Sequence, residues 1–490
     1  MTQDPADYFP PEILAKIFIE SLPFKTAQNM RRNEALRTLQ LVSPRWKELA
    51  LHTPQLWESL IFIIKQGDCR NTWLRVKQWV ERAGGLPVTL FVLGPPHYDW
   101  ADDVACSYCA VTLPEFEDFF KSRITTLFCA PRNLDLLAPI MSNTESLIVL
   151  PDYDFDDSYA FAQLKKHFGT LPRLHKLNFV FAIEDDVFRD LVSDTFSHGS
   201  KLTHLVLTFP NSESWAVVVA NCKNLICGVF EFDYPNPAPS SPTGRQISKL
   251  ESLRNLTLIF WEFATAAVFD YISCPNLISL RFKAERGYRD EDWRADAISH
   301  FSNQIRNISH LSFIRVVLSN FSCVLRSILQ SCSASLEVLD IEHSSSDSSS
   351  TSHVRILQEF TMAQMAPYVL QFPLLRHLSI TDAAITISSE HLNGSHKALK
   401  RLIGNTPLMS DPEGTLRRRG LLNGVIIYIH SSLMYTHQQL ADLRNRATEG
   451  EDLPVRFVML MSSEEKNKCH TSWQYRIEED RNQWYEGLYY

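Results

Sequence analysis

The chain has 490 residues, 45% of them hydrophobic, which is enough for a large core and, on length alone, for about two to four domains. A formal net charge of -8 argues against a nucleic-acid partner, because proteins of that class normally carry a concentrated basic face. The 10 cysteines are too sparse for a disulfide scaffold, and we expect them to be thiols in a reducing compartment.

The opening residues "MTQDPADYFP" lack the basic start, the apolar core and the small-residue cleavage site of a secretory signal. No stretch of the sequence approaches the roughly 18 uninterrupted apolar residues that a membrane-spanning helix needs. We therefore expect a soluble intracellular protein, in the cytoplasm, the nucleus or both, that does not contact a membrane.

The stretch "FPPEILAKIFIESLPF", beginning at Phe9, predicts a first helix. Pro10 and Pro11 suit the start of a helix, and we expect it to run from about Pro11 to Leu22. The apolar residues that follow are spaced by one, three and four positions, which is typical of a broad apolar stripe on a helix; they are Ile13, Leu14, Ile17, Phe18 and Leu22.

A second helical pattern carries Leu36, Leu39, Leu41 and Val42. The insert before it, "KTAQNMRRNEA", is polar and predicts a solvated loop. The stretch "SPRWKELAL" then restarts a helix, because Ser43 can cap it and Pro44 can occupy its first position. The stretch "TPQLWESL" predicts a last short turn that presents Leu56 and Trp57.

This helical unit has more apolar residues than it can cover by itself. Domains of about sixty residues bury only a modest part of their surface. For an amphipathic helix the common explanation is packing against the rest of the same chain. Here the order of the helical motifs along the sequence favours another explanation, in which a second polypeptide covers the apolar residues.

That order resembles the F-box: "PPEILAKIF", then "LRTLQLVSPRW", then "LW", all within sixty residues. The segment from Trp79 to Leu90, "WVERAGGLPVTL", is similar to the "WLxRSGxxPL" segment that follows the F-box in a large family of mushroom-forming (basidiomycete) fungi. The chain departs from the F-box pattern at Phe9, where Leu is usual, at Ser43, where Cys is common, and at Pro44.

The resemblance implies docking to a Skp-type adaptor, and through it to a cullin, in an SCF-type ubiquitin ligase. The residues that it would assign to adaptor binding are Pro11, Ile13, Leu14, Ile17, Phe18, Leu22, Leu39, Val42, Trp46, Leu49, Leu56 and Trp57.

From residue 124 onward, one phrase recurs: a large apolar residue, two spacers, a second apolar residue, one spacer and a third. It occurs as "ITTLFC" at 124, "LHKLNF" at 174, "LTHLVL" at 202, "LICGVF" at 225, "LRNLTL" at 253, "LISLRF" at 277, "ISHLSF" at 308, "LEVLDI" at 336 and "LRHLSI" at 375, with "LIVLPD" at 147 as a partial match. The phrase predicts a short strand in each repeat.

Segments with helical spacing lie between these strands; they are "SESWAVVVANC", "FATAAVFDYIS", "DWRADAISHFS" and "FSCVLRSILQSC". One strand and one helix every 23 to 39 residues is the period of a leucine-rich-repeat solenoid, in which neighbouring repeats must stack. The Asn or Cys that such repeats place three residues after the last anchor is missing, so we expect each turn to be satisfied individually.

The predicted fold is α/β: a small all-α helical domain followed by an irregular leucine-rich-repeat-like solenoid of alternating strands and helices. At the C-terminal end, "GVIIYIH", "HQQLADLRNRA" and "VRFVMLM" predict a strand, a helix and a strand that cap the repeats. The predicted parts are an F-box domain at 1–67, a linking helix and first strand at 68–123, the solenoid at 124–415, and the cap and tail at 416–490.

The strands predict columns of side chains on one face of the solenoid, where a protein substrate would bind. We assign to substrate binding Lys176, His204, Asn255, Arg281, His310, Asp340 and His377. His204 and His310 are four strands apart, or roughly 19 Å, so no metal ion can bridge them.

The sequence shows no recognisable catalytic or metal-binding motif. Cys106 and Cys109 form a CxxC, but no second pair of thiols or imidazoles accompanies it, and we interpret them as two unrelated thiols. We predict no enzyme activity, no cofactor and no metal.

The predicted function is that of a substrate-recognition subunit, which needs no nucleophile because it acts by proximity. The alternatives are a protein-binding scaffold outside ubiquitin ligation, with a degenerate F-box, and an enzyme that uses the CxxC thiols.

Overall fold

The structure of the chain is a computed structural model. It describes residues 9–22, 31–63, 69–93, 117–150, 157–179, 201–209, 212–232, 247–260, 266–284, 301–316, 327–343, 374, 377–382, 426–431 and 456–460. The chain divides into two compact units, residues 1–202 and residues 203–490. We describe each unit by itself.

The first unit opens with three helices and a short turn of 3-10 helix. They are α1 (Pro11–Ser21), α2 (Arg31–Val42), α3 (Pro44–Leu51) and η2 (Pro54–Trp57). The expected restart at Ser43 is confirmed, since the Ser43 side chain accepts a hydrogen bond from the backbone N–H of Trp46 at 3.2 Å and α3 begins at Pro44.

The loop expected before the second helix is wrong in its last part. Residues 31–35 of the insert already belong to α2, because Arg, Asn, Glu and Ala are compatible with the first turns of a helix whose apolar residues follow. The rest of the insert lies outside the described residues.

The five strands described in the first unit are parallel and neighbour one another in chain order. They are β1 (Ser59–Ile63), β2 (Val88–Leu93), β3 (Ile124–Cys129), β4 (Ser146–Val149) and β5 (Lys176–Phe179). Strand β1 precedes the linking helix, so the sheet begins earlier in the chain than the repeated phrase indicated.

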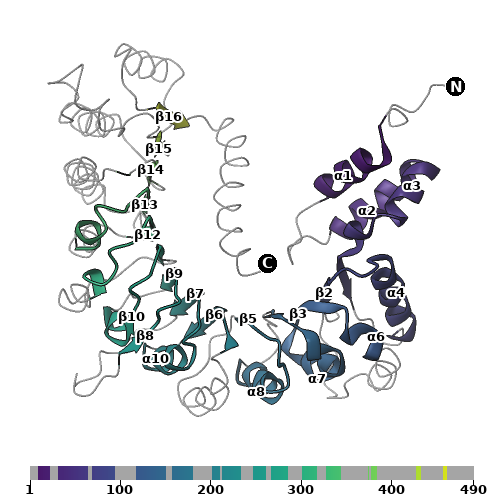
Figure 1. Cartoon of the computed structure of the whole chain (residues 1–490), viewed down its shortest axis with the longest axis horizontal. Coiled ribbons are helices and arrows are strands. Elements are labelled where there is room, and N and C mark those ends of the chain that lie inside the picture. The colour runs from purple at the N-terminus through teal and green to yellow at the C-terminus, as the bar shows by residue number, and fades with distance from the viewer. Residues whose placement is uncertain are drawn as a thin grey trace, which may run out of the picture. The chain divides into compact units, whose positions relative to one another are not determined.

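Helices connect the strands of the first unit. They are α4 (Cys69–Arg82), α6 (Glu117–Lys121), α7 (Leu134–Leu137) and α8 (Asp157–Phe168), with the 3-10 turns η4 (Pro131–Asn133) and η5 (Ala138–Asn143) beside α7. Figure 1 shows α7 and α8 on the same side of β3 and β5. On the helix side of β1, the ring of Phe62 packs edge-on against Trp73 of α4, with 5.3 Å between the ring centroids.

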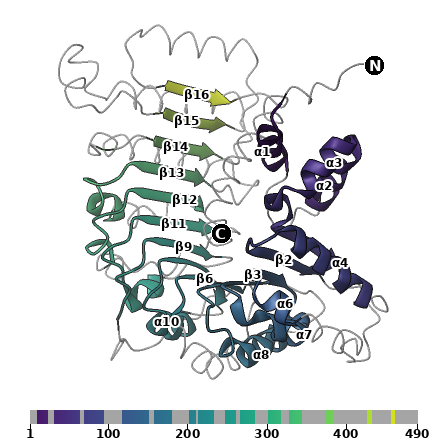
Figure 2. The same ribbon diagram turned by 45° about the vertical axis from the view of Figure 1, so that its right-hand side comes forward.

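The second unit continues the pattern with parallel strands in chain order, side by side in Figure 2. They are β6 (His204–Phe209), β7 (Cys227–Phe232), β9 (Asn255–Phe260), β11 (Ser279–Ala284), β12 (His310–Val316), β13 (Val338–His343), β14 (His377–Asp382), β15 (Ile426–Ser431) and β16 (Arg456–Leu460). A small second sheet pairs β8 (Ser248–Lys249) with β10 (Ile272–Ser273).

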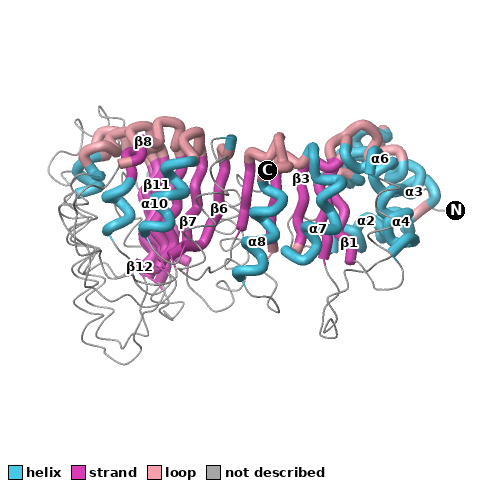
Figure 3. The backbone as a smooth tube through the Cα atoms, turned by 90° about the horizontal axis from the view of Figure 1, so that it is seen from below, coloured by secondary structure: helices cyan, strands magenta, loops and turns pink. Residues whose placement is uncertain are grey.

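The predicted strands are therefore confirmed, including both strands of the expected cap, which pair as β15 and β16 next to β14. The helix expected between the last two lies outside the described residues. Of the other expected helices, the first is α10 (Ser212–Asn221), whereas the described part of the second contains the 3-10 turn η7 (Ala266–Tyr271). The alternation of strands and helices along the chain is visible in Figure 3.

Side chains alternate between the two faces of each strand in the second unit. The rings of Phe230 and Phe232 in β7 pack edge-on against Trp215 of α10, so this face of the sheet is covered by the helices. The repeated anchors Leu205, Leu256 and Leu280 share that face and are buried. The opposite face carries the columns that the sequence assigned to substrate binding.

Side chains also tie the turn of one repeat to the turn of the repeat before it. The amide of Asn276 donates to the carbonyl of Glu251 at 2.9 Å, and the hydroxyl of Ser335 donates to the carbonyls of Arg306 and Ile308 at 2.9 and 2.7 Å. These bonds satisfy backbone carbonyls in the turns that precede the strands.

Candidate docking surface

Half of the apolar stripe on α1 forms the interior of the helical segment. Leu14, Phe18 and Leu22 are buried, and the ring of Phe18 packs on Trp46 of α3 with 4.7 Å between centroids. From α2, Leu36 joins this interior. These side chains hold the three helices together and are not available to a partner.

The other half of the stripe faces water. Four large apolar side chains of α1 and α2 are exposed by 47%, 44%, 84% and 53%; they are Ile13, Ile17, Leu41 and Val42. We call these four residues the outer apolar set. Isolated exposed apolar side chains are ordinary on protein surfaces, but four of them on two short helices form a candidate contact surface.

The remaining residues that the sequence assigned to adaptor binding fall into three groups. Pro11 is exposed beside the outer apolar set. Leu39, Trp46 and Leu49 are half-buried. Leu56 and Trp57 are buried, although the short turn was expected to present them. Leu41 was not assigned, although its place beside Val42 at the end of an apolar run was visible in the sequence.

The residues around the outer apolar set carry charges of both signs. On α1 the exposed side chains of Glu12, Lys16 and Glu20 alternate with the two isoleucines. Arg45, at the start of α3, donates from Nη2 to the carbonyl of Phe9 at 3.1 Å, which ties the residues before α1 to α3. The surface is therefore apolar with a mixed polar border, as protein–protein contact surfaces commonly are.

Trp57 anchors the helical segment to the first strands and α4. Its indole N–H donates to the carbonyl of Ala50 at 2.8 Å, and its own carbonyl accepts from the indole N–H of Trp79 at 3.0 Å. The two rings pack edge-on at 4.7 Å, and the guanidinium of Arg82 lies 4.5 Å from the Trp57 ring centroid.

The turn after α4 completes this anchor. Gly84 has a positive φ of 64°, which glycine adopts without strain, and a Cβ added there would lie 3.9 Å from the side chain of Pro54 in η2. The "WVERAGGLP" segment thus packs against η2, and the helical segment and β1 form one packed body.

The residues assigned to substrate binding are only partly brought together. In the second unit, Asn255, Ser279, His310, Val338 and His377 occupy neighbouring positions in the strand register, as the repeated phrase predicted. Lys176 lies in the first unit. The side chains of Asp340 and His377 lie outside those that the structure describes.

Burial limits which of these side chains a ligand could reach. The column formed by Val206, Val229, Thr257 and Arg281 is buried throughout. His204 and Asn255 are half-buried, and His310 is exposed. Cys227 and Ser279, in the same column as His204 and Asn255, are buried, so in the described part of this face only some of the strand starts are accessible.

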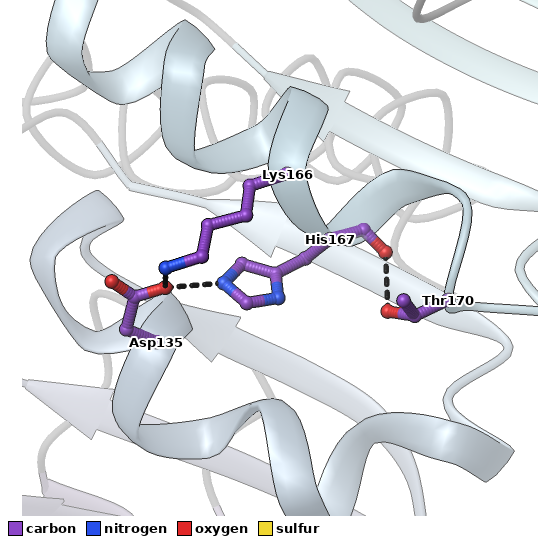
Figure 4. Close-up of polar contacts among 4 residues, drawn as sticks. All are labelled: Asp135, Lys166, His167 and Thr170. Carbon is purple, nitrogen blue, oxygen red and sulfur yellow. Dashed lines mark hydrogen bonds and ion pairs between the residues drawn. The ribbon is translucent and has the colours of Figure 1, made fainter.

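A polar cluster between α7 and α8 is drawn in Figure 4. Asp135 accepts from the ammonium group of Lys166 at 2.8 Å and from Nε2 of His167. Burial raises the pKa of the Asp135 carboxyl, but the hydrogen bonds from Lys166 and His167 outweigh it and hold the pKa below its usual value. Thr170 donates to the carbonyl of His167 at 2.7 Å at the end of α8. We interpret the cluster as a link between consecutive helices.

Four of the buried thiols are poor nucleophiles. Burial raises the pKa of Cys222 and of Cys332 to about 12, and it raises the pKa of Cys129 and Cys274 as well. Cys106 and Cys109 lie outside the described residues. Among the residues that the structure describes, no three His, Cys, Asp or Glu side chains are placed to hold a metal ion, and no helix is long and apolar enough to cross a membrane.

Comparison with known proteins gives little. No family model matches the chain, and no curated protein does. Among solved structures, the chain is similar to one described as the crystal structure of the Rad7 and Elc1 complex in yeast, with 11% identity over 75% of this chain and 97% of that chain, at a TM-score of 0.28.

Proposed function

We propose that the chain is the substrate-recognition subunit of an SCF-type ubiquitin ligase and that it docks to a Skp-type adaptor through the outer apolar set, Ile13, Ile17, Leu41 and Val42. The observation that carries the proposal is their exposure on two helices whose sequence resembles the F-box. A partner that covered these side chains would gain about 1.5 to 3 kcal/mol for each one fully buried, before the costs of association.

The anchor around Trp57 supports this role. A substrate receptor acts by holding its substrate near a charged ubiquitin-conjugating enzyme, which raises the effective concentration of the reacting lysine. That effect requires a fixed relation between the docking helices and the chain that follows. Trp57, Trp79 and Arg82 supply such a relation between the helical segment and α4.

The proposal assigns no catalytic residue to this chain. The proposed role requires only two contacts, one with the adaptor and one with the substrate. Transfer of ubiquitin would be performed by the other subunits.

The test uses the full chain and a purified Skp-type adaptor, with affinity measured by calorimetry. Ile17→Asp places a charge in the outer apolar set, and we expect it to weaken binding by about 2 kcal/mol or more, near thirtyfold. The matched control is Leu74→Asp on α4, because Leu74 is a comparable large apolar side chain, exposed by 41%, outside that set. It should leave the affinity unchanged.

Two results would contradict the proposal. The first is unchanged adaptor binding by Ile17→Asp, which would show that the adaptor does not bind through the outer apolar set. The second is no binding of the adaptor by the unaltered chain, which would favour a scaffold outside ubiquitin ligation. Trp57→Ala is unsuitable here, because Trp57 is buried and its loss would disturb folding as well as docking.

A further inference from the structure

Two of the exposed large apolar side chains in the second unit lie directly before strands of the large sheet. Ile226 precedes β7 and Ile278 precedes β11, and they are exposed by 39% and 40%. The leucines next to them in sequence, Leu225 and Leu277, are buried anchors. The repeat buries the anchor and turns the following residue to water, so an isoleucine there is not explained by the core.

These isoleucines belong to a continuous row along the edge where the strands begin. Backbone hydrogen bonds of 2.8 Å join them. The N–H of Ile226 donates to the carbonyl of Thr203, and the N–H of Arg254 donates to the carbonyl of Ile226. The N–H of Ile278 donates to the carbonyl of Arg254, and the N–H of Ser309 donates to the carbonyl of Ile278. We call Thr203, Ile226, Arg254, Ile278 and Ser309 the strand-entry row. Neighbouring parallel strands lie about 4.8 Å apart, so the two isoleucines are about 10 Å apart with Arg254 between them.

Arg254 is exposed at the centre of the row. Its Nη1 donates to the carbonyl of Asn276 at 3.0 Å, which holds the guanidinium close to the next turn. A guanidinium has five N–H donors in a rigid planar arrangement that matches a carboxylate. Arginine beside apolar side chains is a combination that is frequent at the energetic centres of protein interfaces.

A hydroxyl and an imidazole lie at each end of the row. Thr203 Oγ1 is hydrogen-bonded to Nδ1 of His204 at 2.9 Å, and Ser309 Oγ to Nδ1 of His310 at 2.7 Å. Each bond fixes its ring through Nδ1, so the Nε2 atom of the exposed His310 points away from Ser309. These groups can hydrogen-bond a ligand that lies along the row.

The charges nearby favour an acidic ligand. Lys223 and Arg306 are exposed on the turns that lead into β7 and β12. The acidic side chain of Glu251 is paired with Lys249 at 2.5 Å. Glu337, half-buried, follows the row before β13. Around Arg254 the edge is thus locally basic, although the chain as a whole carries a formal net charge of -8.

We infer that the strand-entry row binds a polypeptide segment in which a carboxylate side chain stands between two apolar side chains. The apolar groups would pack on Ile226 and Ile278, and the carboxylate would pair with Arg254. This inference rests on the proposed function, because it names the class of substrate that the receptor would recognise. It also places the contact beside the columns of the sheet rather than on them.

The test selects peptides from a random library displayed on phage, with the full chain as bait, and measures the affinity of the selected peptides by fluorescence anisotropy. We expect enrichment of an acidic residue flanked by apolar residues. Arg254→Glu should weaken binding about tenfold or more, and exchanging the acidic residue of the peptide for lysine should restore binding to that variant.

The matched control is Arg173→Glu, which reverses the charge of an exposed side chain on the equivalent turn before β5. It should leave peptide binding unchanged. The double variant Ile226→Ser, Ile278→Ser should also weaken binding of the selected peptides. Exchanging the acidic residue of the peptide for lysine should not restore binding to this variant, because its Arg254 is unaltered. The inference is overturned if no acidic pattern is enriched, or if the selected peptides bind Arg254→Glu and the double variant as well as they bind the unaltered chain. No adaptor is present in this assay, so its outcome is independent of docking through α1 and α2.

Discussion

On α1 of the helical segment, Ile13 and Ile17 are nearly half exposed, whereas the repeated anchors Leu256 and Leu280 of the second unit are completely buried. The difference follows from how each region covers its apolar residues. A strand repeat is covered by the repeats on either side and by its helices, so every anchor finds a neighbour. Three short helices have no such neighbours, and their second apolar face stays open.

The comparison also shows that apolar residues have two structural roles in this chain, as core residues and as exposed surface residues. In the repeats, a leucine or phenylalanine at an anchor position signifies packing. On α1, adjacent apolar residues signify different things, since Phe18 is interior and Ile17 is surface. The separation of these roles can be tested by substitutions at the two kinds of position.

Phe18→Ala should lower the free energy of unfolding by about 3 to 5 kcal/mol, because it removes a fully buried ring packed on Trp46. Ile17→Ala, one position away on the exposed face, should change it by about 0.5 kcal/mol or less. Chemical denaturation of the full chain measures both. Equal losses would mean that the two faces of α1 are not distinct.

A second comparison tests the packing of the repeats. A Cβ added at Gly228 in β7 would lie 2.7 and 2.9 Å from ring atoms of Phe230 and 3.1 Å from Leu225. Gly228→Ala should therefore destabilise the second unit by about 1 to 3 kcal/mol.

The control for that variant is Gly169→Ala at the end of α8, where a Cβ would have no atom within 4 Å. We expect a change of about 0.5 kcal/mol or less. Thermal unfolding distinguishes the two. A Gly228→Ala variant as stable as the unaltered chain would show that the repeats are packed more loosely than these distances indicate.

The smallest effect concerns the polar link between α7 and α8. Asp135→Asn removes the ion pair with Lys166 and the carboxylate that is hydrogen-bonded to His167, and we expect a loss of about 1 kcal/mol near pH 7, since the ion pair is partly exposed. Because the pKa of the Asp135 carboxyl is lowered in the folded state, its contribution is present above the ordinary carboxyl pKa of about 4 and is lost as the pH falls through the folded-state pKa.

The stability difference between the unaltered chain and Asp135→Asn should therefore shrink between about pH 7 and about pH 3. Denaturation at the two pH values measures it. A difference that stays constant or grows on acidification would contradict the assignment of the effect to the ionised carboxylate.

The strands were the most predictable part of the fold. The phrase of three apolar anchors begins two residues before each of β6, β7, β9 and β11 and overlaps the first four residues of each, because alternation is a local property of the chain. Strand β1 was missed because "SLIFI" has no such alternation. In its described part, the second expected helix is the 3-10 turn η7, since helical spacing alone does not decide the type of helix.

The candidate surfaces were predictable only in outline. Helical spacing identified an apolar stripe around Ile13 and Ile17 but could not tell which half would be interior. For the strand-entry row, a usable pattern was present: the residue after the first anchor is polar or charged before most of the strands in the described part of the second unit, and Ile226 and Ile278 depart from this.

The sequence by itself determined where the repeated strands begin and where the helix restarts at Ser43, since both depend on residues close together in the chain. Only the tertiary structure decided that Trp57 would anchor the helices to α4 while Ile17, Leu41 and Val42 stay exposed. The physical reason is that exposure depends on which elements pack together, and apolar residues of equal hydrophobicity are assigned to core or surface by that packing alone.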